Sequence, residues 1–226
     1  MTSPQPDRES EGEGGPRTET GGPEAGGAYA PKRSVAAADE AKLSLVALRD
    51  GAIIAVLLSI FAAAESWATV SRLGFATFLS VVDGLLVGAA TNALVHEWGH
   101  FVGARLGGGH APLKPLTKFL PLYDFDYANN DGRAFLWMSY GGNLAHAALV
   151  LAYLALVHTP GREGTAALVA GAFGFAVFSS LVEIPVIQQA RRGVPGLEAL
   201  GVIPKDFVNR YLPWALGAAF LAYAVL

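Results

Sequence analysis

The sequence predicts an all-α membrane protein: a bundle of about five transmembrane helices that follows a disordered N-terminal tail. Of its 226 residues, 52% are hydrophobic and only 15% are charged, whereas soluble domains carry about 25% charged residues. Five apolar stretches follow the first 40 residues, without the alternating pattern of a membrane β-barrel. Cysteine is absent, which excludes disulfides, thiol catalysis and zinc sites with cysteine ligands.

The first predicted unit is a cytoplasmic tail, residues 1–40. It holds seven Gly, five Pro and eight acidic residues, but no Leu, Ile, Phe or Trp. Such a composition cannot bury enough apolar surface to offset the entropy of ordering the chain. The tail also lacks the apolar core of a signal peptide, so we expect a solvated leader or, alternatively, a segment that docks another protein. The second unit, 41–226, is the predicted transmembrane domain.

The apolar stretches of this domain are long enough to be spans, since a helix needs about 20 apolar residues to cross a bilayer. In the first stretch the only charged residue is Glu65; the second, which is the longest, carries Asp83 and a polar cluster near its end. The third stretch contains no Lys, Arg, Asp or Glu, the fourth contains only Glu183, and the fifth is short and closes the chain. In chain order, the predicted spans are 52–71, 75–104, 134–157, 165–187 and 211–226.

The distribution of positive charge predicts the orientation. With a cytoplasmic N-terminus, fourteen of the sixteen Lys and Arg residues lie inside, and only Arg72 and Arg162 lie outside. We therefore expect a multi-pass protein of the cell membrane, with the second and fourth spans both ending near the cytoplasmic face. No basic stripe is present, so nucleic acid is not an expected partner.

The polar cluster of the second span is an H-E-x-x-H motif formed by His96, Glu97 and His100. Residues four apart share one face of a helix, so both imidazoles can bind one metal ion. Zinc suits such a site, because catalytic zinc takes three protein ligands and keeps a position for water. Glu97 can then accept the proton of that water as the catalytic base. The alternative is a polar patch that joins helices by hydrogen bonds.

The segment HEWGHFVGARLGG, residues 96–108, resembles the first motif of the site-2 protease family, the intramembrane zinc metallopeptidases. The resemblance implies a hydrolase that cuts peptide bonds in or near membrane-spanning segments of substrate proteins within the lipid bilayer. It implies Zn²⁺ as cofactor, with His96 and His100 as zinc ligands and Glu97 as general base.

A second segment, GGNLAH at 141–146, is similar to the family's second motif. Gly142 matches the family's glycine, whereas Asn143 stands at a proline position and His146 at an asparagine position. The resemblance implies that Asn143 and His146 shape the site and hold the substrate. For His146, a metal ligand and a residue that only links helices are the alternatives.

The family's third motif, which carries an Asp ligand, is missing, and Gln188 falls on its position when Ser180 takes the place of the family's Asn. Glu183 is the only carboxylate in the fourth predicted span and lies at the depth of the two histidines. We therefore expect Glu183 to be the third zinc ligand. His146 and the 124–131 loop are the alternatives, and Glu183 could also be an acid that pairs with a His or Arg for packing.

The segment 107–133 between the second and third spans holds three prolines and is too broken to span the membrane. We expect it either to fold back near the site and guide an extended substrate, or to be an ordinary cytoplasmic loop. Two other functions remain open for the chain. The missing third motif favours a catalytically inactive relative that binds membrane segments, and an intramembrane His/Glu set also suits a small metal or proton carrier.

Overall fold

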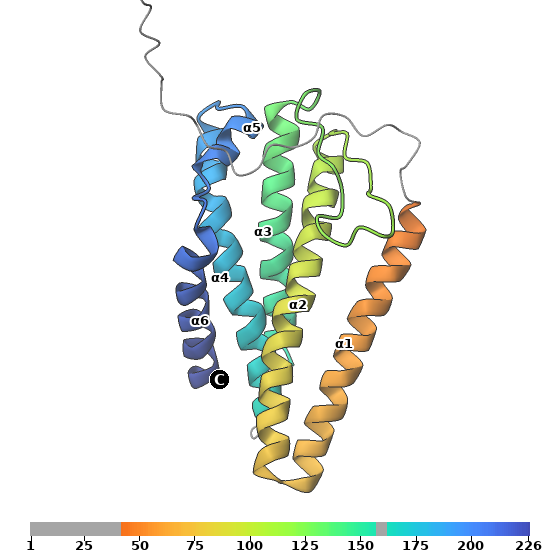
Figure 1. Cartoon of the computed structure of the whole chain (residues 1–226), viewed down its shortest axis with the longest axis vertical. Coiled ribbons are helices and arrows are strands. Elements are labelled where there is room, and N and C mark those ends of the chain that lie inside the picture. Colours follow the sequence, from red (N-terminus) through yellow and green to blue (C-terminus); the bar gives the residue numbers. More distant parts are fainter. Residues whose placement is uncertain (1–41, 157–161) are drawn as a thin grey trace, which may run out of the picture.

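The computed structural model describes residues 42–156 and 162–226, so the predicted tail lies outside the described residues. The long helices lie side by side in an elongated bundle (Figure 1). Within the described ranges every regular element is a helix, and the predicted all-α class is confirmed. The elements are α1 (Leu43–Ser71), α2 (Gly74–Leu106), α3 (Gly132–Leu154), α4 (Glu163–Arg191), α5 (Gly196–Ala199), the short 3₁₀ helix η2 (Leu200–Val202) and α6 (Phe207–Val225).

Each of the five long helices overlaps one of the five predicted apolar stretches, but α1 begins at Leu43, nine residues before the first predicted span, and α6 begins at Phe207, four residues before the fifth. Residue 157, at the end of the third predicted span, lies outside the described residues. Three of the five helices, α1, α2 and α4, are long and apolar enough to cross a membrane. Polar residues make α3 and α6 less apolar. Helix α3 contains Asn143 and His146, and α6 contains Asn209 and Arg210 in its first turn. The described chain therefore has three candidate spans, and the count of about five stays a prediction.

Helix α2 packs against α1, α3 and α4 and is the centre of the bundle. Glycines allow close approach: a Cβ atom on Gly99 would overlap the backbone of Gly141 on α3. In the same way, a Cβ atom on Gly88 would overlap the backbone of Leu168 on α4. Small residues are what membrane helices use to bring their backbones together. The polar end of α2 is thereby held close to both α3 and α4.

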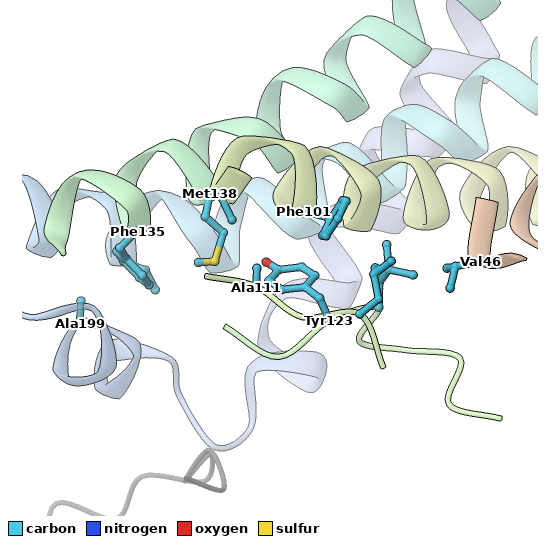
Figure 2. Close-up of a cluster of buried hydrophobic side chains, with 11 residues drawn as sticks. Val46, Phe101, Ala111, Tyr123, Phe135, Met138 and Ala199 are labelled. Atoms are coloured by element: carbon cyan, nitrogen blue, oxygen red, sulfur yellow. The ribbon is translucent and has the colours of Figure 1, made fainter. Parts of the chain in front are cut away.

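A buried apolar cluster joins the helices to the segment between α2 and α3 (Figure 2). It includes Val46 of α1, Phe101 of α2 and Tyr123 of that segment. Phe135 and Met138 contribute from the first turns of α3. Burial of these side chains fixes the segment against the same end of the bundle that carries the histidines of α2.

The segment between α2 and α3 is also held by hydrogen bonds. Leu113 and Tyr123 pair in an isolated antiparallel bridge. The Arg49 guanidinium on α1 donates to the carbonyl oxygens of Leu116 and Lys118, each at 3.0 Å. The segment therefore folds back against the helices; that it guides an extended substrate stays a prediction.

Candidate metal centre

Three side chains from two helices converge at the end of α2. The Glu183 Oε1 atom on α4 lies 2.8 Å from His96 Nε2 and 2.9 Å from His100 Nε2. The two imidazole Nε2 atoms are 3.0 Å apart. This group, in which His96 is buried and the other two are half-buried, could hold a metal ion.

The hydrogen bonding of His100 fits a cation in the group. Its Nδ1 lies 2.8 Å from the Met138 carbonyl oxygen, which can only accept, so Nδ1 donates; in the neutral ring Nε2 then carries the lone pair that a metal ion would take. Ligand histidines are usually oriented in this way by a bond from the other ring nitrogen. A tetrahedral ion with bonds of about 2.0 Å separates its ligand atoms by ~3.3 Å, a few tenths of an ångström more than the separations here. The donor set therefore fits a cation.

The space that His100 occupies depends on a glycine of α3. A Cβ atom on Gly142 would overlap the His100 imidazole ring. The two histidines share one face of α2 because they are one helical turn apart. That face meets the glycine surface of α3, so the imidazoles are directed toward α4 and Glu183.

The second carboxylate oxygen of Glu183 is held by Asn143 on α3. The Asn143 Nδ2 atom donates to Glu183 Oε2 at 2.5 Å and to the Ser139 carbonyl oxygen at 3.1 Å. The Ser180 hydroxyl donates to Asn143 Oδ1 at 3.3 Å. A flipped amide would direct an oxygen at two acceptors, so these contacts fix its orientation. Glu183 thus has one oxygen toward the histidines and one toward Asn143.

His146 lies beside the group without joining it. Its ring stacks on that of His96, with centroids 5.2 Å apart and an interplanar angle of 12°. The His146 Nε2 atom is 3.4 Å from the Ser180 hydroxyl. Gln188, the residue at the family's Asp position, is exposed on α4. Of the candidates for a third ligand, the structure brings Glu183 next to both histidines; its role as a ligand stays a prediction.

The acidic residues of the 124–131 segment have partners of their own. Asp124 pairs with Lys114 at 3.0 Å. Asp126 accepts a hydrogen bond from Asn129 Nδ2 at 2.8 Å, and this bond lowers the pKa of the Asp126 carboxyl. Asp131 is the N-cap of α3 and accepts a backbone hydrogen bond from its first turn. None of the three acids belongs to the group around His96.

Glu97 lies outside the three-residue group but lines the same cavity. The cavity measures about 520 Å³, and His100 and Glu183 also line it. The Glu97 Oε2 atom accepts a hydrogen bond from the Leu122 backbone amide at 3.3 Å. Glu183 contacts the two histidines, whereas Glu97 accepts a hydrogen bond from a backbone amide. Glu183 is therefore placed to bind a metal ion, and Glu97 is free to accept a proton. The general-base role of Glu97 stays a prediction.

Sequence reasoning gave no role to Ser179, which contacts the group. Its hydroxyl donates to Glu183 Oε1 at 3.3 Å and lies 3.1 Å from His96 Nε2. Ser179 precedes Glu183 by four residues, so helical spacing was the available signal. The Met138 carbonyl and the Leu122 amide are backbone groups, and their contacts depend on tertiary packing that no residue type reveals.

No family model, curated protein or solved structure matches this chain. The resemblance to the site-2 protease family therefore stands on the quoted motifs of α2 and α3. Apart from that resemblance, the geometry shows that the two histidines of α2 and the carboxylate of Glu183 on α4 converge in a group that could hold a metal ion.

Proposed function

We propose that the chain is an intramembrane zinc metalloendopeptidase, a hydrolase of the site-2 protease type. The observation that carries the proposal is the convergence of His96 Nε2, His100 Nε2 and Glu183 Oε1, with Glu97 on the same cavity. Two imidazoles and one carboxylate are the protein ligands of several catalytic zinc sites. Zinc suits this nitrogen and oxygen set in a chain without cysteine.

His96, His100 and Glu183 are the residues that would hold the ion. A bound zinc ion supplies a Lewis acid for the scissile carbonyl and lowers the pKa of water to about 7. Glu97 accepts the proton of the attacking water and passes it to the leaving amine. The Leu122 amide holds one oxygen of Glu97, and Asn143 holds one oxygen of Glu183, so both carboxylates are oriented before a substrate binds.

On this proposal the chain crosses the membrane five times, with its N-terminus in the cytoplasm. Helices α3 and α6 are the two further spans in this proposal; α3 packs against α2 and α4, and α6 packs against α4. Exposed apolar side chains cover the outside of the bundle, including Leu48 at 70%, Trp214 at 71% and Phe220 at 73%. The charge asymmetry then places the histidines near the cytoplasmic face of the cell membrane. The substrate is a membrane-spanning or membrane-proximal segment of another protein.

The test is cleavage by the purified, zinc-loaded chain in detergent, with a digest of membrane proteins as substrate and new peptide ends read by mass spectrometry. The parent should generate new ends, and Glu97→Gln should keep its zinc while cleavage falls by about 10²- to 10⁴-fold, because the base is lost. Ile184→Ala, at an exposed position beside Glu183, is the matched control and should cleave like the parent.

Two outcomes would contradict the proposal. A zinc-loaded parent that generates no new ends would be an inactive relative that binds membrane segments. A chain that retains no zinc but moves protons or metal across a vesicle membrane would be a carrier. Cleavage that persists in Glu97→Gln would remove the role assigned to that residue.

A further inference from the structure

The cavity beside the candidate metal centre has two chemically different parts. Glu97, His100 and Glu183 form a polar end. The rest is lined mainly by apolar side chains of the folded segment, α3, α4 and the region after α5; they include Tyr123, Phe125, Tyr127, Phe135, Val182 and Val186. A substrate with its scissile carbonyl at the polar end would therefore have a neighbouring side chain in the apolar part.

Ring contacts stabilise the shape of the apolar wall. The ring centroids of Phe125 and Tyr127 are 5.0 Å apart, and both rings contact Phe135 at 6.0 and 6.1 Å. Tilted and edge-on aromatic pairs of this kind are favourable beyond the area they bury. Phe135 is also 2% exposed, so its ring is fixed from behind. The wall is preformed and does not need a ligand to assemble.

The charges on the cavity do not favour a charged occupant. Lys114 and Asp124 both line it, and they pair with each other at 3.0 Å. The carboxylates of Glu97 and Glu183 lie at the polar end, where they accept hydrogen bonds from the Leu122 amide and from Asn143. A charged side chain in the apolar part would lose its hydration without gaining an opposite charge.

We infer that the apolar part of this cavity is a specificity subsite, which takes a bulky apolar side chain, aromatic or long aliphatic, from the substrate residue beside the scissile bond. The inference rests on the proposed function, since it assumes that the carbonyl lies at His96, His100 and Glu183. Substrates are then selected by the side chain beside the scissile bond as well as by the apolar character of the membrane segment.

Hydroxamic acids test the subsite without a known substrate, because the hydroxamate group binds zinc and the acyl chain probes the neighbouring space. The probes are acetohydroxamic, isocaprohydroxamic and hydrocinnamohydroxamic acid, titrated against the full zinc-loaded chain in detergent. Each buried CH₂ group should contribute about fourfold in affinity. The hydrocinnamoyl compound should therefore bind at least about tenfold more tightly than the acetyl compound.

Matched variants separate the cavity from partition into detergent. Val182→Trp fills the cavity and should abolish the preference while acetohydroxamate still binds, whereas Ile184→Trp, at a 47% exposed position of the same helix, should retain it. Phe125→Ala removes part of the wall and should reduce the preference even if Val182→Trp does not fold. Equal affinities of the three compounds for the parent overturn the subsite and leave the zinc site intact. Failure of all three to bind overturns the zinc site and the subsite together.

Discussion

Replacing Asn143 by alanine should weaken metal binding although Asn143 is not a ligand in our account. The substitution removes the 2.5 Å hydrogen bond from Asn143 Nδ2 to Glu183 Oε2. A hydrogen bond to a charged group contributes about 1.5–3 kcal/mol, which corresponds to a loss of about 10- to 100-fold in affinity. Residues that orient metal ligands show losses of the same size when they are replaced.

The assay is competition for zinc against a chromophoric chelator at fixed pH. Ser180→Ala removes only the 3.3 Å bond to Asn143 Oδ1, so it should lower the zinc affinity less, by about tenfold at most. Leu144→Ala, at the neighbouring 68% exposed position of α3, is the control and should bind zinc like the parent.

A second readout distinguishes orientation of Glu183 from general destabilisation. In the cobalt-substituted protein, Asn143→Ala frees Oε2 to bind the metal, so the visible absorption should weaken as the coordination number rises above four. A zinc affinity of Asn143→Ala within twofold of the parent, with an unchanged cobalt spectrum, would show that Asn143 does not orient Glu183 for metal binding.

Three further predictions follow from packing, charge and composition. Gly142→Ala should lower zinc occupancy several-fold because its Cβ atom overlaps the His100 imidazole, whereas Gly132→Ala, with open space around it, should not; metal analysis of both variants checks this. A reporter fused after Leu226 should be external and one in the segment between α2 and α3 cytoplasmic, and an internal C-terminus would contradict five spans. Deletion of residues 1–40 should leave zinc content and cleavage unchanged, since that composition cannot form part of a packed site; loss of zinc would show otherwise.

Sequence periodicity and composition were enough to predict the five long helices, because apolar length alone identifies such segments. The pairing of His96 with His100 followed from the pitch of one helix. The proximity of Glu183 was predicted from its depth in the membrane, which required only the direction of two helices. The number of spans was harder to predict. Asn143 and His146 lie at or beside the site, and these same polar residues make α3 less apolar than α1, α2 and α4.

The remaining features of the site depend on tertiary contacts between residues far apart in the chain. The family resemblance gave Asn143 a role in shaping the site and holding the substrate, but it did not predict that its amide contacts Glu183. The contacts of the Met138 carbonyl and the Leu122 amide could not be predicted, because every residue carries a carbonyl and nearly every residue an amide. The folding of the segment between α2 and α3 depends on Arg49, which is distant in sequence.

Whether His96, His100 and Glu183 form a zinc site is decided by the zinc content of the purified chain and its variants, measured by mass spectrometry after equilibration with equimolar zinc. We expect one zinc ion per chain in the parent, in Glu97→Gln and in Gln188→Ala, and well below half occupancy in Glu183→Ala, which leaves only His96 and His100. Full zinc occupancy in Glu183→Ala, or none in the parent, would contradict the assignment of these three residues as the metal centre.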